Sequence, residues 1–439
     1  MLIVPEGGRF YVIPFGHGRH KIPDRILEPR FGRLVTLNAL DPKAVRVIEN
    51  LKFDGTSRNS RTQVAQPASL LAFDLQPSAE IVKSLGGRAQ ANSFAKRISG
   101  STFAQVTAPL GLSTLRTTLV ECHKLFSSKA YRKELGWIDQ IEIVNDPTLA
   151  GRLDAQAMKL VVAPSSTTSA WFSIPEVVEW DDFSSFSIRG LGKTQAGLDD
   201  LFRQNVIDAL AGAKPTPDLL QRGRVYMKRT SHPERSWSVY NCLYAEVVQG
   251  TTNYILHDGQ WYQIENNLVA SVNATVKSLT NATLTLPPWP DGDHEATFNA
   301  ALAAANAGAV LGDKKLVRIG GSPIEVCDVL CRSGELVHVK HYKNSATLSH
   351  LFAQGLNSAE ALADASFRSD AASELKAPQL NTSTWSPGKH PVVYVIGSRS
   401  SKTAAAINLP FFSKLTLHNC VRQLRGMQHA VHLNGVHIH

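Results

Sequence analysis

The sequence predicts an α/β protein whose first half is α+β and whose second half carries a mixed sheet flanked by helices. Short apolar runs that alternate with period two, typical of strands, recur along the whole chain. Stretches with apolar residues at helical spacing separate many of these runs, most regularly after residue 290. Helices that alternate with strands in this way cover the faces of a sheet.

Chain length and one proline-rich segment predict two domains. The 439 residues can bury more than one core. The segment AKPTPDLLQRG, residues 213–223, has two prolines and no periodicity, so we place the boundary there. This gives an α+β domain at 1–213 and a nucleic-acid-binding domain at 214–439. The formal charge of +9 favours an acidic partner, and nucleic acid is the commonest.

The cysteines and the apolar runs indicate where the protein works. Its five cysteines are scattered, without the spacing of a secreted scaffold, which favours a reducing compartment. We find no signal-peptide pattern and no apolar stretch of about 18 residues. We therefore expect a cytoplasmic protein that does not associate with membranes.

The elements of the first half follow from local patterns. RFYVIPFGHG (9–18) and FGRLVTLNAL (31–40) predict strands. Asp41 before Pro42 is a typical N-cap, so 41–51 should begin a helix. Residues 112–135 carry apolar side chains at helical spacing and predict a long amphipathic helix.

After residue 223 the pattern changes to strands, and Asp258-Gly259 predicts a two-residue hairpin turn between two of them. The expected elements, in chain order, are strands at 224–230, 238–250 and 253–265, helices at 266–281 and 294–308, strands at 322–331 and 335–342, a helix at 345–363, a strand at 390–398, a helix ending near 426 and a final strand-like segment at 429–439.

The two strands joined at Ser333-Gly334 carry the candidate reaction centre. Side chains alternate faces along a strand, so His338 and Lys340 share one face of the second strand. If that face matches the one that carries Asp328, the three side chains converge. A carboxylate that holds a divalent cation, beside a lysine that orients water or stabilises phosphate charge, can support phosphodiester hydrolysis.

This succession of helix, strand with Asp, turn, strand ending in Lys, and helix resembles the core of the PD-(D/E)XK nucleases. The resemblance implies a restriction-endonuclease-like sheet between helices that binds Mg²⁺ or Mn²⁺. Asp328 matches the metal-binding Asp and Lys340 the catalytic lysine, while Glu295 and Gln354 match residues on the flanking helices. His338 stands where the superfamily has an acid, which would favour Mn²⁺. The expected metal ligands are Asp328, Glu325 and His338.

Two other interpretations of the hairpin are possible. It could be a solvated hairpin, with Glu325 and Asp328 as surface charges and Lys340 protecting an edge. It could also be a zinc knuckle formed by Cys327, Cys331, His338 and His341, although alternation points neighbouring side chains to opposite faces.

A basic segment at 222–240 predicts nucleic-acid contact. Cations for phosphates and aromatic faces for bases are what a single-strand groove needs. The candidate residues are Arg224, Lys228, Arg229, Arg235 and Trp237, together with Lys343 farther along. The alternative is an edge strand that charge keeps soluble, with its aromatic side chains in the core.

Several phrases, among them FGHGRH (15–20), LEPRFGRLVTLNALDP (27–42) and LVHVKHYKNSATLSHLFAQGLNSAEAL (336–362), resemble a sporadically distributed bacterial family of unknown function found near restriction and phage-defence genes. The resemblance implies a defence protein that binds foreign nucleic acid, DNA before RNA, and cuts it with a divalent metal. The alternatives are a non-catalytic sensor or assembly subunit with a degenerate nuclease fold, and a protein-interaction subunit. A protein partner or a homo-oligomer would fit each of these roles.

Overall fold

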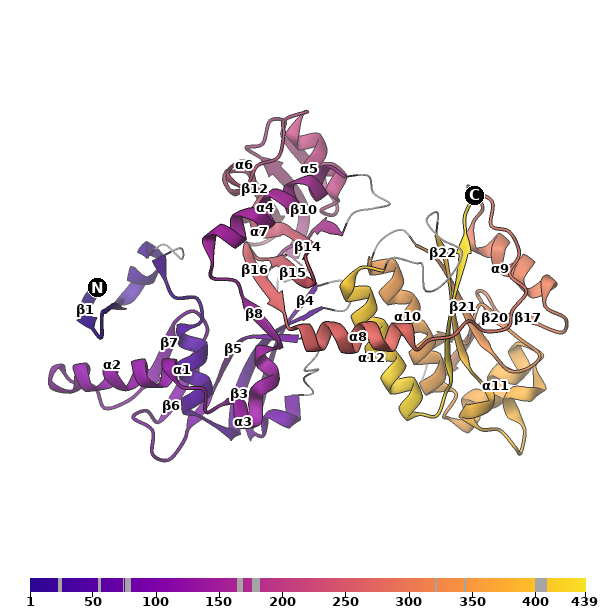
Figure 1. Cartoon of the computed structure of the whole chain (residues 1–439), viewed down its shortest axis with the longest axis horizontal. Helices are drawn as coiled ribbons and strands as arrows, with labels where there is room; N and C mark the ends of the chain where they lie inside the picture. The colour runs from indigo at the N-terminus through magenta and orange to yellow at the C-terminus, as the bar shows by residue number, and fades with distance from the viewer. Residues whose placement is uncertain are drawn as a thin grey trace. The chain divides into compact units, whose positions relative to one another are not determined.

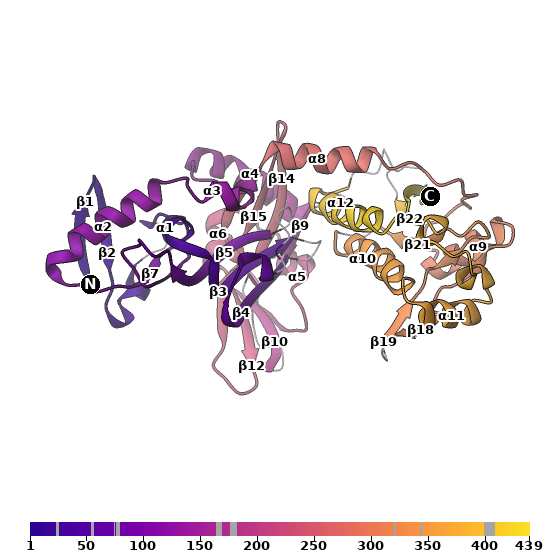
Figure 2. The same ribbon diagram turned by 90° about the horizontal axis from the view of Figure 1, so that it is seen from below.

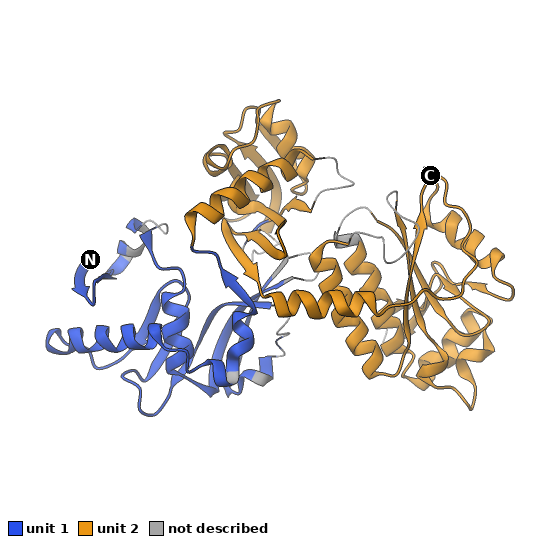
Figure 3. Ribbon diagram, viewed as in Figure 1, with its two compact units in different colours: residues 1–52, 57–145, 174–180 blue, residues 53–56, 146–173, 181–439 orange. Residues whose placement is uncertain are grey.

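The computed structural model describes residues 1–22, 26–53, 57–73, 75, 80–163, 169–175, 182–319, 322–342, 345–398 and 409–439. The fold is mixed α/β with open sheets, which confirms the predicted class (Figure 1). The chain divides into two compact units, of which unit 1 comprises residues 1–52, 57–145 and 174–180, and unit 2 comprises 53–56, 146–173 and 181–439 (Figure 3). None of the helices in these described stretches has the length and apolar character that crossing a bilayer requires.

Unit 1 is built on a five-stranded sheet in the order β4-β3-β5-β6-β7, in which β5 runs antiparallel to β3 and β6. A separate antiparallel hairpin, β1-β2, precedes it. Helix α1 packs on β6 and against α2. The elements are β1 (Leu2–Glu6), β2 (Arg9–Ile13), α1 (Phe31–Ala39), β3 (Leu40–Phe53), β4 (Ser57–Ala68), β5 (Glu80–Ala89), β6 (Arg97–Gly100), β7 (Ala104–Thr107), α2 (Leu112–Ser127), α3 (Arg132–Leu135) and β8 (Ile141–Ile143).

Two predictions for residues 31–51 are wrong, because tertiary packing overrides both local patterns. Residues 31–39 form the helix α1, whose Gly32 lies so close to the backbone of Phe103 that a Cβ would meet it at 2.1 Å. Residues 40–53 form strand β3 instead of a helix. The Asp41 carboxylate accepts a hydrogen bond from the Lys43 N–H (2.9 Å), so it closes a local turn without capping a helix.

Unit 2 begins with two antiparallel sheets. One has the order β11-β10-β12-β13, and the other contains β16-β15-β14-β9. Asp258 and Gly259 both have positive φ between β15 and β16, which confirms the predicted hairpin turn. Bounds are α4 (Pro147–Val162), β9 (Ala170–Phe172), β10 (Phe183–Arg189), β11 (Gln195–Leu198), α5 (Arg203–Leu210), α6 (Pro217–Arg222), β12 (Arg224–Arg229), β13 (Arg235–Ser238), α7 (Val239–Cys242), β14 (Leu243–Gln249), β15 (Thr252–His257), β16 (Gln260–Ile264) and α8 (Asn266–Lys277).

The C-terminal part of unit 2 is a mixed five-stranded sheet in the order β17-β20-β21-β22-β23. Strands β21, β22 and β23 are parallel, whereas β17 and β20 run antiparallel to their neighbours. Bounds are α9 (Glu295–Ala305), β17 (Val310–Leu311), β18 (Leu316–Ile319), β19 (Ser322–Glu325), β20 (Val329–Leu330), β21 (Leu336–His341), α10 (Ser345–Ala361), α11 (Ala365–Glu374), β22 (Val392–Ser398), α12 (Phe411–Gly426) and β23 (Val431–His437).

Helices cover both faces of this sheet, as the sequence predicts. Helices α10 and α12 lie side by side on one face, where Leu336 and Tyr394 belong to the same core as their apolar residues (Figures 1 and 2). Helix α9 packs on the other face, where Val337 and Val339 meet Phe298. The predicted strand at 322–331 is broken into β19 and β20, and Asp328 lies in the break.

The predicted boundary at residue 213 lies within one sheet. Strand β10 precedes this position and β12 follows it, yet the two are paired antiparallel, with Ile188 opposite Val225. The predicted helix at 112–135 is also shorter than expected, since α2 ends at Ser127 and α3 begins at Arg132.

Candidate metal centre at the edge of the C-terminal sheet

Asp328 lies just before β20 begins, and its carboxylate accepts a backbone hydrogen bond from the neighbouring strand β21. Its Oδ2 accepts a hydrogen bond from the Val339 N–H (2.7 Å) and its Oδ1 accepts one from the Asn299 Nδ2 (3.0 Å). Val339 belongs to β21, beyond the short stretch that β20 pairs. The carboxylate therefore takes the place of the backbone carbonyl that a longer β20 would offer to β21. The two donors, one on β21 and one on α9, fix the orientation of both carboxylate oxygens.

Two further carboxylates converge on Asp328. One ligand atom from each of Asp313, Glu325 and Asp328 lies within 4.8 Å of the others, so together they could hold a metal ion. Asp313 is brought there by its backbone, since the N–H groups of Gly312 and Asp313 both donate to the Asp328 carbonyl (2.8 and 3.0 Å). Asp328 is buried, and the other two carboxylates are half-buried.

Glu325, at the end of β19, is held from two sides. Its Oε1 accepts a hydrogen bond from the Lys314 N–H (2.6 Å), and its Oε2 accepts a long one from the Gln354 Nε2 of α10 (3.5 Å). Gln354, which the nuclease resemblance singles out, thus reaches the carboxylate cluster through Glu325.

The cluster is electrostatically strained without a cation. The pKa of the Asp328 carboxyl is raised to about 7, chiefly because the group is buried. The Val339 N–H and the Lys340 ammonium lower this pKa, while the nearby Glu325 and Asp313 raise it. Like charges this close in a buried place repel one another, and a bound cation would relieve the repulsion. In addition, the Oδ1 of Asn299 is buried with no hydrogen-bond partner among the described residues. A cation, or a water bound to one, would satisfy that oxygen.

Lys340 and Glu295 form an ion pair at the same edge of the sheet. The Lys340 Nζ lies 2.7 Å from the Glu295 Oε2, and both side chains are partly exposed. Lys340 is at the end of β21 and Glu295 is the first residue of α9. The structure thus brings together the two residues that the nuclease resemblance matched to a catalytic lysine and a helical acid.

His338 is separated from the carboxylates. Its side chain is buried on the α10 face, where its Nε2 lies 3.2 Å from the Ser358 Oγ and its ring packs beside Tyr394. Burial lowers the pKa of His338 to about 4, so the imidazole is neutral. Among the described residues, no group of metal ligands within 4.8 Å includes it. The three side chains of Asp328, His338 and Lys340 were expected to converge because side chains alternate faces along a strand. Asp328 precedes β20, so this alternation does not apply to it.

Among the described residues, no cluster of metal ligands contains Cys327, Cys331 or His341, the other members of the zinc-knuckle alternative. All five cysteines are buried and free of disulfides.

The basic segment forms β12 and β13, and most of its cations have protein partners. Arg229 pairs with Asp182 (2.9 Å), and Arg224 donates to the Ser236 Oγ (3.0 Å). Arg235 lies 5.2 Å above the ring of Trp237, which is buried. Lys228 is exposed. The predicted contact residue Lys343 lies outside the described residues.

Comparison with known proteins places the chain in a family. The sequence profile of DUF6119, a family of unknown function, matches residues 1–437. The chain belongs to the DUF6119 family. No curated protein and no solved structure matches it. The mixed sheet with its carboxylate cluster therefore has to be interpreted from its own geometry.

Two residues at the carboxylate cluster of this DUF6119 protein, Asp313 and Asn299, were not predicted from the sequence. Asp313 belongs to a turn with Lys314, whose φ is +63°, and a GDKK segment between two short strands is a turn signal. Asn299 is buried on the inner face of α9, at 2% exposure. A buried asparagine one turn after Glu295 was the available signal, because such a side chain needs a polar partner.

Proposed function

We propose that this DUF6119 protein is a metal-dependent phosphodiesterase that acts on nucleic acid. The observation that carries the proposal is the convergence of the Asp313, Glu325 and Asp328 carboxylates beside Lys340. Carboxylates supply the hard oxygen ligands that Mg²⁺ and Mn²⁺ prefer. With His338 away from the cluster, the reason for favouring Mn²⁺ over Mg²⁺ no longer applies.

The residues around the cluster have separate roles in this proposal. Asp313, Glu325 and Asp328 would hold the ion, which supplies a polarised water and neutralises phosphate charge. The Val339 N–H and the Asn299 amide orient Asp328, and Gln354 orients Glu325. Lys340, kept at the sheet edge by Glu295, would donate hydrogen bonds to a phosphate oxygen as charge develops there.

DNA is the proposed substrate and phage defence the proposed context. The net charge of +9 and the exposed Lys228 support an anionic polymer as partner. The defence context depends on the resemblance to proteins encoded near restriction genes.

The test is a cleavage assay on end-labelled single-stranded and duplex DNA with Mg²⁺ or Mn²⁺. We expect cleavage by the wild type, and a loss of at least about a hundred-fold in Asp328→Asn and Lys340→Gln, since a metal or a cationic donor each supplies several kcal/mol to such a transition state. Glu360→Gln, which neutralises an exposed acid on α10, is the matched control and should cleave normally. Equal rates in wild type and Asp328→Asn would overturn the proposal.

One observation favours a non-catalytic nucleic-acid-binding protein as the second candidate. His338 stands where the PD-(D/E)XK nucleases that the hairpin resembles have an acid. In this protein it is a neutral core residue that is hydrogen-bonded to Ser358. A nuclease-like site in which one metal-ligand position has changed in this way could keep its fold and lose its catalytic activity. Salt-dependent retention of DNA, with no cleavage under either metal, would favour this candidate.

A further inference from the structure

Unit 1 contains a cavity that the proposed metal centre does not use. Its volume is about 210 Å³, and it opens between the start of α1, the end of α2 and the segment from α3 to β8. All of its lining residues belong to unit 1. Pockets for drug-sized ligands typically measure about 300–1,000 Å³, so this one suits a small ligand or one chemical group of a larger ligand.

The wall of the cavity carries an excess of positive charge. Four cations line it, Arg30, Arg33, Lys129 and Arg132, together with two carboxylates, Asp139 and Glu142. Arg30 also pairs with Glu28 (3.2 Å), which does not line the cavity. Arg33 is buried, at 8% exposure, and its Nη1 donates to the Val82 carbonyl (3.3 Å), so its guanidinium is held in a fixed place. A fixed guanidinium loses little freedom when it binds an anion.

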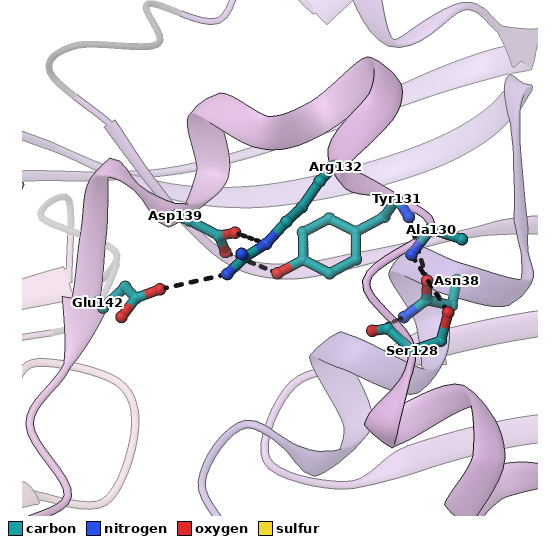
Figure 4. A network of polar contacts seen from close by, with 7 residues as sticks. All are labelled: Asn38, Ser128, Ala130, Tyr131, Arg132, Asp139 and Glu142. Carbon is teal, nitrogen blue, oxygen red and sulfur yellow. Dashed lines mark hydrogen bonds and ion pairs between the residues drawn. The ribbon is translucent and has the colours of Figure 1, made fainter.

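A network of hydrogen bonds holds one side of the cavity in shape (Figure 4). The Asn38 Nδ2 donates to the Ser128 carbonyl (3.1 Å), and the Asn38 Oδ1 accepts from the Tyr131 N–H (3.1 Å). The Tyr131 hydroxyl donates to Asp139 (2.6 Å), and the Arg132 Nε pairs with the same carboxylate (2.6 Å). Arg132 also reaches Glu142 (3.7 Å), so its side chain crosses the site between two acids.

Lys129 differs from Arg132 because it has no carboxylate partner in the described part of the chain, and its side chain is exposed at the rim. Ser127, Ser128 and Phe126 also line the cavity. The Phe126 ring packs against Phe31, and Arg9 lies 5.2 Å from its centre. Guanidinium groups, an ammonium and hydroxyls are the donors that proteins use for phosphate oxygens. A phosphate monoester carries about −1.5 to −2 charges at pH 7, so a wall on which cations outnumber carboxylates would attract it.

We propose that this cavity binds the phosphate group of a small phosphate monoester, with a mononucleotide as the fitting class of ligand. Lys129, Arg30 and Arg33 would contact the phosphate oxygens, and Phe126 would contact the apolar part of the ligand. The site is independent of the proposed metal centre, which lies in unit 2.

The test is calorimetric titration of the full-length protein at low ionic strength with three probes: AMP, inorganic phosphate and adenosine. We expect AMP and phosphate to bind and adenosine to fail, because the phosphate supplies the charge. Lys129→Ala and Arg30→Gln should each weaken AMP binding about ten-fold, as loss of one charge-assisted hydrogen bond does. Lys133→Ala removes the same charge from an exposed neighbour that does not line the cavity, and should bind as the wild type does.

The possible results separate the proposal from its competitors. If Arg30→Gln unfolds, Lys129→Ala still decides, since Lys129 is exposed and its loss leaves the network of Figure 4 intact. Absence of AMP and phosphate binding at millimolar ligand would overturn the proposal. An equal loss in Lys133→Ala would also overturn it, because it would show diffuse electrostatic attraction. Binding of adenosine as strong as that of AMP would show that the phosphate is not recognised.

Discussion

At the scale of single residues, Asp328 and His338 show how surroundings decide the role of a buried polar group. Burial raises the pKa of Asp328 to about 7, and two carboxylates and an ammonium lie within electrostatic reach of it. Burial lowers the pKa of His338 to about 4, and its neighbours are a hydroxyl and a tyrosine ring. The first environment can accept a cation, whereas the second keeps an imidazole neutral and packed.

The pKa of His338 predicts a pH dependence of stability. The folded-state pKa of about 4 lies below the ordinary value of 6.5, so the unfolded chain binds the proton more readily. The contribution of His338 to the free energy of unfolding should therefore be constant above about pH 7 and fall as the pH drops from about 6.5 towards 4. His338→Gln, which can still bond Ser358, should lose about 2–3 kcal/mol less over this range than the wild type.

Urea denaturation of both proteins at a series of pH values measures this difference. Carboxylates elsewhere contribute equally to both curves, so the difference isolates His338. Parallel curves for wild type and His338→Gln would show that His338 is not a buried neutral group.

Sequence reasoning could predict part of the site at this scale. Strand alternation and the spacing of Asp328 and Lys340 were enough to select the hairpin, and Glu295 does reach Lys340. Asp313 could not be predicted, because it reaches the cluster through backbone hydrogen bonds of its turn to Asp328. Contacts of that kind depend on tertiary structure and leave no periodic pattern in the sequence.

At the scale of elements, the packing of α1 on β6 explains why the first strand prediction after residue 30 failed. Gly32 on α1 and Gly100 on β6 let the two backbones touch, since a Cβ on Gly100 would lie 2.0 Å from the Gly32 carbonyl oxygen. An isolated FGRLVTLNAL segment has β-branched and apolar residues in both helical and strand registers. The partner surface, absent from local sequence, decides between them.

This close approach predicts a strong effect of one methyl group. Gly100→Ala should destabilise the protein by about 3 kcal/mol or more, because the nearest obstructing atoms are the Gly32 backbone carbonyl, which cannot rotate away. Gly136→Ala, in the same unit, is the control: its φ of −59° suits alanine and its Cβ would meet nothing closer than 4.0 Å. It should be neutral or stabilising by about 0.4–1 kcal/mol.

Thermal unfolding followed by calorimetry compares the two variants, with hydrogen exchange to locate the change. Protection should fall in α1 and β6 of Gly100→Ala and stay unchanged in Gly136→Ala. A Gly100→Ala protein as stable as the wild type would show that α1 can move off the sheet at little cost.

At the scale of the whole molecule, regular alternation of helix and strand made the C-terminal half the more predictable part. The predicted helices at 294–308 and 345–363 correspond to α9 and α10, and the predicted strands correspond to β21 and β22. The first half was harder to predict because its strands are long and bulged and do not all pair in chain order. Strand β3, for example, pairs with β5 through several register shifts. The proline-rich segment at 213–223 includes the short helix α6 and connects strands of one sheet.

The central claim is that a divalent cation binds at Asp313, Glu325 and Asp328. Titration of the wild type with Mn²⁺, followed by calorimetry and electron paramagnetic resonance, tests it most directly. We expect one bound ion per chain, with affinity at least about ten-fold weaker in Asp328→Asn and Glu325→Gln, because each variant removes a charged ligand. Asp370→Asn, which neutralises an exposed acid on α11, should bind as the wild type does. Equal Mn²⁺ affinity in Asp328→Asn, Glu325→Gln and wild type would contradict the account.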